Sequence, residues 1–574
     1  MTNNTDFSIA VIADAHFHDI DGDYGVPGLG HRSLTLRTWD DTRTSTRVFN
    51  ESAMALRAAL DEVAARKIGH VVLLGDYTDD GQRLTTQSVA KLLADHEKRF
   101  GTRFYALPGN HDIFGPKGRH QAKRFLQADS TSKLVTSDAA EDTPDNLLNP
   151  HMYCEGYPLG LNPMAAFGYF RRADDLHWES PFGLSDDPAS RIYAVSSPDG
   201  QNHYDLMDAS YLIEPEKDLW LLMLDANVFE PRDGDFPVGS EQAFIDSTAA
   251  GWNAMLRLKP FIFDWIADVA KRAKERGKTL LTFSHYPVID PFDDPENTGK
   301  TLFPKSNMAK RKPSDAVAEA LITAGITVHF SGHLHVEGVT RHANDDGQLI
   351  NVAVPSLVAF PPAFKHLTLQ RDMLAIDTID LSALPVDPDI MAAYQHETTQ
   401  TGAVPDAAIF AQTYGAFLRL HLTALVEHRF FIREWPRDVV ACLAPMSVQQ
   451  LCLDPQTRPA RPDSLGLEDK QDLADLSVVE IVSDWYCLWH GGGRALPILG
   501  EKRIALLRWL ADLYAEPADS DTSITEFLAA FFKALRHFLS RAEHDITQIS
   551  LLPASLLHNS LNRNRFKEKI MQQI

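Results

Sequence analysis

Short apolar runs that each end in a polar cluster recur six times in the first 380 residues of this 574-residue chain. The runs cover residues 7–13, 70–74, 104–107, 219–224, 279–283 and 326–330. Continuous apolar runs of this length are typical of strands buried on both faces of a sheet. Apolar residues at helical spacing lie between several of them, as in 54–63 and 261–269. The alternation predicts an α/β layered sheet, whose ligands bind beyond the carboxyl ends of the strands.

The polar clusters that follow the runs are rich in metal-ligand side chains: Asp14, His16, Asp76, Asn110, His111, His285, His333 and His335. Two divalent cations held about 3.5–4 Å apart need several ligands each and one carboxylate that bridges them. Imidazole nitrogens combined with carboxylate and amide oxygens suit Mn, Fe, Zn or Co better than Mg or Ca. Alternate residues of an extended segment share a face, so Asp14 and His16 are expected to point the same way.

Each motif on its own is a weak signal. A lone D-x-H or G-D occurs often by chance, and a lone His at a strand end is more often a satisfied polar residue than a metal ligand. The ordered set is far more specific: D-x-H, then G-D, G-N-H-D, a lone His and G-H-x-H, each after a predicted strand. The set as a whole therefore predicts a metal centre.

This ordered set resembles the five motifs of the calcineurin-like metallophosphoesterases, over roughly residues 7–380. The resemblance implies an α/β fold built as a four-layer α/β/β/α sandwich with two divalent or transition metal ions, Mn, Fe, Zn or Co. It implies the following ligand sets: Asp14, His16 and His335 at one ion, Asn110, His285 and His333 at the other, and Asp76 bridging both.

The resemblance also implies that His111 is a general acid, which protonates the leaving-group oxygen, rather than a metal ligand. Asp79 matches the carboxylate that pairs with this His in some family members, and Asp112 is the alternative partner. A carboxylate beside the imidazole would raise the pKa of His111 and fix its tautomer. Both Asp79 and Asp112 are therefore candidate catalytic residues.

Departures from the family pattern argue against two branches of the family. Purple acid phosphatases have a metal-ligating Tyr where this chain has Asp79, and protein Ser/Thr phosphatases typically have Arg-Gly where Asp80-Gly81 stands. The pattern is closer to the cyclic-nucleotide-phosphodiesterase-like and small-molecule phosphoesterase branch. The segment 203–227, two apolar strands ending in Leu-Asp-Ala-Asn, is similar to the central part of that branch.

The chain is predicted to divide into a metallophosphoesterase domain over residues 1–384 and an α-helical C-terminal domain over 385–574. Insertions at about 18–48 and 113–217 interrupt the first domain, and we expect both to narrow the mouth of the site. The alternative is that these loops only cover the sheet and have no chemical role. His31, Arg32 and Arg37 are candidates to contact the substrate. The helical domain could cap the site, form an oligomer or bind a partner. His490-Gly491-Gly492-Gly493 is interpreted as a flexible loop, because no esterase nucleophile motif accompanies it.

The amino-acid composition restricts the kinds of partner that the chain is expected to bind. The chain has 55 Lys and Arg against 78 Asp and Glu, a formal net charge of −23, and four Cys. The acidic balance argues against a nucleic-acid polymer as partner. The sequence also predicts a cytoplasmic protein, because it has few Cys, no apolar run long enough to span a membrane and no leader.

The predicted function is hydrolysis of small phosphodiesters. A metal-bridging hydroxide attacks phosphorus while His111 protonates the leaving group. The alternatives are a phosphomonoesterase acting on a small metabolite and a non-catalytic scaffold that keeps the fold.

Overall fold

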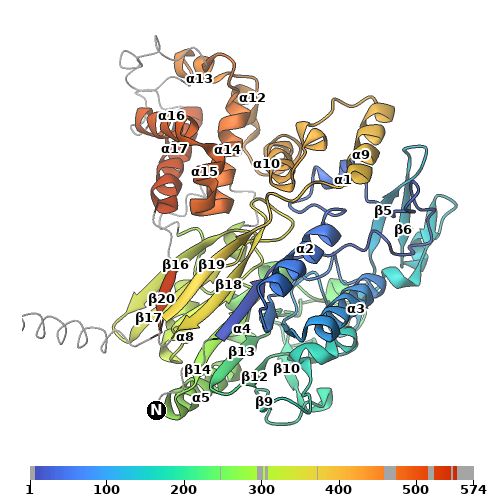
Figure 1. Cartoon of the computed structure of the whole chain (residues 1–574), viewed down its shortest axis with the longest axis vertical. Coiled ribbons are helices and arrows are strands. Elements are labelled where there is room, and N and C mark those ends of the chain that lie inside the picture. The colour runs from blue at the N-terminus through green and yellow to red at the C-terminus, as the bar shows by residue number, and fades with distance from the viewer. Residues whose placement is uncertain are drawn as a thin grey trace, which may run out of the picture.

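The computed structural model describes residues 7–245, 247–293, 302–303, 308–370, 373–457, 473–514, 523–543 and 547–551. Two mixed β-sheets lie at its centre, flanked by helices (Figure 1). All six predicted strands are present with boundaries shifted by at most two residues.

The first sheet has the strand order β20-β19-β18-β1-β2-β3. Its strands are β1 (Phe7–Ile12), β2 (His70–Leu73), β3 (Arg103–Ala106), β18 (Ala363–Gln370), β19 (Met373–Asp380) and β20 (Gln548–Ser550). Strands β1, β2 and β3 run parallel, with Ile9 opposite His70 and His70 opposite Arg103. Their carboxyl ends, which precede the first three motifs, therefore meet at one edge.

The second sheet has the order β16-β17-β15-β14-β13-β12-β9. Its strands are β9 (His177–Glu179), β12 (Tyr211–Glu216), β13 (Leu219–Leu224), β14 (Thr279–Ser284), β15 (Val328–Ser331), β16 (Gly338–Asn344) and β17 (Gly347–Ala353). Strands β13, β14 and β15 are parallel neighbours. The motifs that contain His285 and His333 follow β14 and β15 at their carboxyl ends.

Alternate residues of β13 separate into two hydrophobic cores. Leu219, Leu221 and Met223 pack in the core between the sheets, whereas Trp220 and Leu222 pack against the helices outside the second sheet. Those helices are α4 (Gly251–Leu258), α5 (Phe261–Arg276) and α8 (Asp315–Thr323). Helices α2 (Ser52–Ala65) and α3 (Arg83–Phe100) lie outside the first sheet (Figure 1). The layers confirm the α/β/β/α architecture expected from the sequence.

The two insertions have structure of their own. The first contains α1 (Trp39–Thr42). The second contains the short strands β4 (Gly118–Arg119), β5 (Ala122–Leu126), β6 (Ser132–Thr136), β7 (Asn146–Leu148), β8 (Cys154–Glu155), β10 (Ile192–Ser196) and β11 (His203–Met207). These strands form small two- and three-stranded sheets apart from the central ones.

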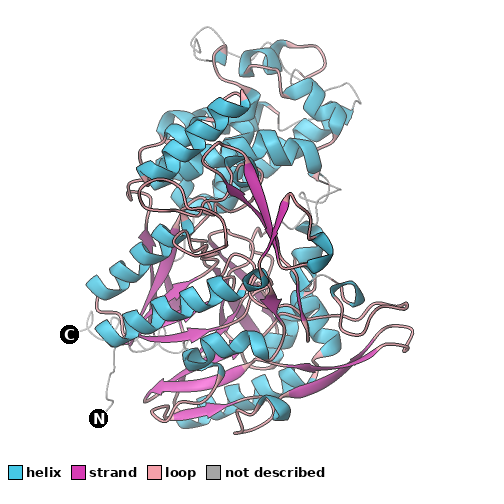
Figure 2. Ribbon diagram, turned by 90° about the vertical axis from the view of Figure 1, so that its right-hand side faces the viewer, coloured by secondary structure: helices cyan, strands magenta, loops and turns pink. Residues whose placement is uncertain are grey.

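A mainly helical region follows β19, as expected, and lies at one end of the sandwich (Figure 2). It comprises α9 (Pro388–Thr401), α10 (Tyr414–Leu425), the π-helix η9 (Val426–Phe430), α11 (Phe431–Arg433), α12 (Arg437–Leu443), α13 (Val448–Leu453), α14 (Val478–Gly491), α15 (Ala495–Leu499), α16 (Glu501–Leu513) and α17 (Ser523–Ala542). A capping box, in which Ser477 and Glu480 bond each other's backbone N–H, begins α14.

The chain returns from this region to the first sheet. Strand β20 pairs antiparallel with β19, with Leu374 opposite Ile549. One hydrophobic core runs from β1 through to Trp485 on α14 and Phe531 on α17. The helical region is therefore packed on the sandwich and tied to its sheet at both ends. Within the described residues, the helices are too short or too polar to span a bilayer.

Candidate metal centre

The loops after β1 and β2 lie side by side and position the first three predicted ligands. The backbone N–H of Asp14 donates to the carbonyl of Gly75 (3.3 Å), and that of His16 donates to the carbonyl of Asp76 (2.8 Å). The backbone N–H of His111, next to Asn110 after β3, donates to Asp76 Oδ1 (2.8 Å). Parallel pairing of the three strands thus brings three motifs that are well separated in the sequence into one cluster.

Asp14, His16 and His335 form one group of converging ligand atoms. The Nε2 atoms of His16 and His335 are 3.0 Å apart, and Asp14 Oδ1 lies 3.6 Å from His335 Nε2 and 4.0 Å from His16 Nε2. All three side chains are buried or nearly so. Three donor atoms within this distance can share one cation.

Asp76, His285 and His333 form the second group. His285 Nε2 lies 3.3 Å from Asp76 Oδ2, 3.2 Å from His333 Nδ1 and 3.3 Å from Asn110 Oδ1. Asp76 Oδ2 is also 3.7 Å from His16 Nε2, in the first group. Asp76 therefore lies between the two groups, the position that a bridging carboxylate requires.

The donor set and its surroundings fit two metal ions. The Nδ1 atom of His16 is buried with no hydrogen-bond partner among the described residues. Burial lowers the pKa of His16 and of His333 well below the ordinary value, which favours the neutral imidazole that ligates metals. Although burial opposes protonation, Asp76 raises the pKa of His285 to about 9. The acidic side chains therefore favour positive charge at this place.

The backbone has an unusual conformation at five of the candidate ligands. Asp14, His16, Asp76, His333 and His335 have positive φ values of 50°, 38°, 48°, 71° and 53°. Each such conformation costs a non-glycine residue on the order of 1–3 kcal/mol, and such conformations cluster at functional sites. The neighbouring glycines permit close approach: a Cβ at Gly109 would lie 2.1 Å from Asp76 Oδ1, and one at Gly332 would lie 2.5 Å from Asp14 Oδ2.

Hydrogen bonds to the protein orient the ligands further. His285 Nδ1 donates to the carbonyl of Leu74 (2.8 Å), which turns Nε2 toward Asp76. The backbone N–H of His333 donates to Asp14 Oδ2 (3.0 Å). Such second contacts fix tautomer and ring orientation at metal sites.

His111 lies beside this centre, and its carboxylate partner is neither of the two predicted ones. The His111 Nδ1 atom bonds the Asp80 carboxylate. Asp79 instead accepts hydrogen bonds from Arg37 Nη1 (3.1 Å) and Arg47 Nη2 (3.0 Å). The pairing of His111 with Asp79 was therefore wrong, and the one-residue difference arises where Asp80 takes an unusual backbone conformation, φ 100°.

Asp112 is a structural residue of the adjoining turn. Its carboxylate accepts from the backbone N–H of Thr78 (2.9 Å) and of Gly109 (2.9 Å), and burial together with nearby Asp76 raises the pKa of Asp112 to about 7. The pairing of Asp112 with His111 was therefore also wrong. The sequence signal for Asp80 was present in Asp79-Asp80-Gly81, but spacing alone could not choose between adjacent carboxylates.

Burial, with a contribution from Arg47, lowers the pKa of His111 to about 3. The guanidinium of Arg47 lies 3.4 Å from the ring Nδ1. Because Asp80 accepts only from a protonated Nδ1, the neutral ring presents an unprotonated Nε2. An anionic phosphoester beside the ring would favour the imidazolium by opposite charge.

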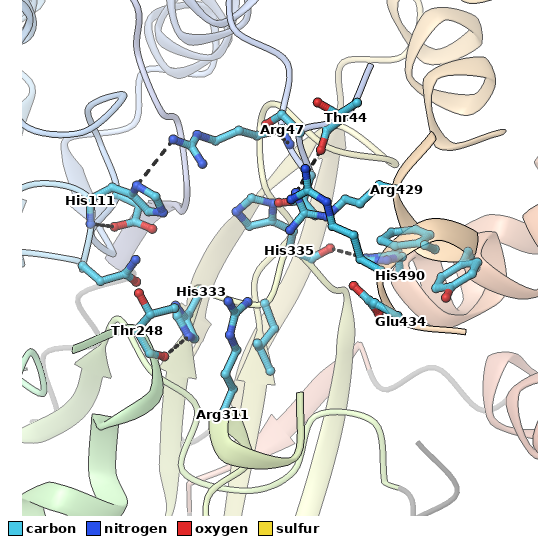
Figure 3. Close-up of a pocket in the computed structure, with 18 of the residues that line it drawn as sticks. Thr44, Arg47, His111, Thr248, Arg311, His333, His335, Arg429, Glu434 and His490 are labelled. Atoms are coloured by element: carbon cyan, nitrogen blue, oxygen red, sulfur yellow. Dashed lines mark hydrogen bonds between the residues drawn. The ribbon is translucent and has the colours of Figure 1, made fainter. Parts of the chain in front are cut away.

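A cavity of about 600 Å³ opens over the centre. Its floor includes Asp76, Asn110, His111, His333 and His335. Its opposite wall comes from the helical region, whose lining residues are Arg429, Phe430, Arg433, Glu434, Tyr486, Trp489 and His490. Figure 3 shows His335 between the metal-motif side chains and this wall.

A family model described as calcineurin-like phosphoesterase matches residues 7–221. These residues belong to the calcineurin-like phosphoesterase family. The match ends before His285, and the structure shows that the remaining motifs belong to the same sandwich. The family and the site together support metal-dependent hydrolysis of a phosphoester.

Two solved structures are similar to this chain at low sequence identity. A dimetal phosphatase from Danio rerio is 14% identical and covers 65% of this chain and 96% of its own, with a TM-score of 0.33. The phosphopantetheinyl hydrolase from Mycobacterium tuberculosis is 11% identical and covers 61% of this chain and 89% of its own, with a TM-score of 0.22. No curated protein sequence matches the chain.

The two insertions contribute to the cavity in a different way from the one expected from the sequence. The first supplies Asp41 and residues 44–47, whereas the described lining contains no residue of 113–217. Arg32 pairs with Asp387 (2.6 Å) at the start of α9, Arg37 is bound to Asp79, and His31 is absent from the described lining. The expected contacts of these three side chains with substrate are thus not supported by their positions.

The His490-Gly491-Gly492-Gly493 segment is ordered rather than a flexible loop. It forms the end of α14 and the following 3-10 turn. The backbone N–H of Glu337 donates to the carbonyl of His490 (2.7 Å). At Gly492, φ is 49° and an added Cβ would lie 3.0 Å from the Glu337 carbonyl oxygen. These glycines allow the helical region to approach the loop that follows His335.

Proposed function

We propose that the protein hydrolyses small phosphodiesters at a dinuclear metal centre. The observation that carries this proposal is the cavity of about 600 Å³, with the converging candidate ligands on one side and the helical region on the other. This volume is within the range of small-molecule sites, roughly 300–1,000 Å³. A polymer would need an open groove, and the net charge of −23 opposes polyanions at long range.

The ligand assignment follows the two groups of donor atoms. Asp14, His16 and His335 would hold one ion, and Asn110, His285 and His333 the other, with Asp76 shared. Two ions, when bound, supply charge neutralisation of the phosphoryl oxygens and a lowered pKa for a water nucleophile. The protein's own contribution is to fix these side chains before substrate arrives, through the strained turns and the hydrogen bonds described above.

His111 would act on the leaving group. Asp80 holds its Nδ1, so Nε2 is the nitrogen left to face a substrate oxygen in the cavity. A proton on Nε2, favoured by the anionic substrate, can pass to the departing alkoxide. Asp80 and Arg47 then act as positioning residues, because they contact the ring and not the reacting atoms.

A diester has a second organic substituent, and the cavity offers an apolar wall for it. Phe430, Tyr486 and Trp489 line the helical side, with the rings of Phe430 and Tyr486 stacked 4.4 Å apart. Aromatic faces bind planar organic groups well. The cyclic-nucleotide and small-molecule branch suggested by the motifs is consistent with such a substituent.

Turnover of bis-p-nitrophenyl phosphate and p-nitrophenyl phosphate with added manganese tests the proposal, with Asp76→Asn as the blank. We expect metal-dependent release of nitrophenolate, faster from the diester. Faster cleavage of the monoester would favour the alternative of a small-metabolite phosphomonoesterase. Two bound metals with no turnover of any ester in a panel of nucleotides, cyclic nucleotides and sugar phosphates would favour a scaffold.

A further inference from the structure

Four arginines line the cavity over the metal centre: Arg47, Arg311, Arg429 and Arg433. Arg47 is occupied, because it bonds Asp79 and Asp80. Arg311 ends α7 (Met308–Arg311), and the other two come from the helical region. Figure 3 shows Arg47, Arg311 and Arg429 reaching toward the same space from separate parts of the chain.

The guanidinium group of Arg429 has an incomplete set of hydrogen bonds. Its Nη1 donates to the carbonyl of Thr44 (2.9 Å), while its Nε is buried with no hydrogen-bond partner among the described residues. A buried guanidinium N–H without an acceptor is costly. An anion in the cavity would supply the missing acceptor.

The charges around Arg429 favour the same conclusion. Burial lowers the pKa of Arg429, and although Glu434 opposes this, Arg433, Arg311 and Arg47 add to the lowering. Guanidinium groups that line one cavity repel one another, and an anion that binds among them offsets this repulsion. Arg419 of the same helical region shows the contrast, because Asp484 pairs with it at 2.5 Å.

Arg433 is exposed and forms no ion pair with an acidic residue in the part of the chain that the structure describes. It follows Arg429 by four residues, one helical turn, so both project from the same side of η9 and α11. The pair belongs to the cavity wall opposite the metal ligands. The cavity therefore has two places for negative charge, the metal centre and this arginine wall.

We propose that Arg429 and Arg433, with Arg311, bind a second phosphate of the substrate, so that the substrate is a small organic phosphoester carrying another phosphate group. The scissile phosphate at the metal ligands rests on the function proposed above. The aromatic side chains of the same wall, Phe430, Tyr486 and Trp489, would contact the organic body that joins the phosphates. A ligand held at both ends gains the orientation that a small, singly charged ester lacks.

The first experiment measures binding without turnover. Calorimetric titration of the metal-free full-length protein with inorganic pyrophosphate measures anion binding in the cavity without the metals, and the variants show how much of it depends on Arg429 and Arg433. We expect saturable binding that weakens at least tenfold in Arg429→Gln and in Arg433→Gln, with a smaller loss in Arg429→Lys. Arg437→Gln, which removes an exposed arginine four residues further on, is the matched control and should bind as the wild type does. Equal binding in Arg433→Gln and Arg437→Gln would overturn the proposal.

The second experiment uses two matched diesters with the manganese-loaded protein. These are the p-nitrophenyl ester of thymidine 5′-phosphate and the same ester with an added 3′-phosphate. We expect the 3′-phosphate to raise kcat/KM at least tenfold, and Arg429→Gln or Arg433→Gln to abolish most of that preference while Arg437→Gln retains it. A wild-type ratio near one, or a ratio unchanged in both arginine variants, would contradict the second site. If neither ester is cleaved but pyrophosphate binding depends on Arg429 and Arg433, the proposed function fails and the second anion site stands.

Discussion

His490 Nδ1 lies 3.1 Å from the backbone carbonyl oxygen of His335. Since a carbonyl can only accept, the His490 ring donates from Nδ1. A helix of the C-terminal region is thereby hydrogen-bonded to the loop that carries a predicted metal ligand. The helical region forms the wall of the cavity and also holds one edge of the metal centre in place.

His490→Ala should weaken metal binding and activity together. Loss of the hydrogen bond frees the His335 loop, and loss of comparable supporting contacts at metal sites costs about 10–100-fold in affinity or activity. We expect the lower part of that range, because His490 bonds backbone and not the ligating ring. Metal titration with elemental analysis measures the effect. His396→Ala, an exposed histidine on α9, is the control, and equal behaviour of the two variants would refute the role.

Asp76→Ala should abolish binding of both metals and all hydrolysis. Asp76 Oδ2 lies 3.3 Å from His285 Nε2 and 3.7 Å from His16 Nε2. Its loss would remove a ligand from both groups, together with the negative charge that offsets the repulsion between two cations. Elemental analysis after gel filtration provides the measurement. Asp377→Asn, an exposed carboxylate on β19, should retain both metals. An active Asp76→Ala variant with two tightly bound ions would exclude a bridging role.

His111→Ala should retain the metals but lose hydrolysis of esters with poor leaving groups. General acid catalysis contributes typically 10²–10⁴-fold, and a nitrophenolate needs little protonation, so the loss should be smaller for nitrophenyl esters. The comparison requires one alkyl and one nitrophenyl diester. Losses of the same size for both would argue against proton donation by His111.

Asp80→Asn should have a smaller effect of the same kind, about tenfold, and shift the pH profile of kcat. Its carboxylate orients the His111 ring and stabilises the imidazolium. Asp79→Asn tests the pairing with His111 that the sequence predicted. We expect this variant to disturb the contacts of Asp79 with Arg37 and Arg47 and not the His111 ring. Asp345→Asn, on an exposed turn, should leave the pH profile unchanged.

Glu51→Gln should stabilise the protein at alkaline pH. Glu51 is fully buried, and burial raises the pKa of its carboxyl from 4.5 to about 8. The folded state thus holds a proton that the unfolded state has lost, and stability falls as pH rises from about 4.5 to 8. We expect the melting temperature of the variant to match the wild type near pH 5 and to exceed it by several degrees at pH 8.5. Glu501→Gln, an exposed residue of α16, should show no such trend.

The sequence predicted the candidate metal ligands because their positions depend on the order of strands and motifs along the chain. Each of the candidate ligands could be predicted because it follows a buried strand, and parallel strands bring such positions to one edge. These are Asp14, His16, Asp76, Asn110, His285, His333 and His335. The partner of His111 could not be identified the same way. Asp79, Asp80 and Asp112 are all within reach in sequence, and the choice depends on a single backbone conformation at Asp80.

Local sequence thus determined the strands, the two-sheet sandwich and the set of candidate ligands, because hydrophobic periodicity and motif order are properties of short segments. Only the tertiary structure decided what surrounds those ligands. Arg429, Arg433, Trp489 and His490 are more than 90 residues from the nearest metal motif along the chain, yet they form the wall of its cavity. Their positions depend on long-range packing of helices against the sandwich, and no local pattern encodes which surface a helix will cover.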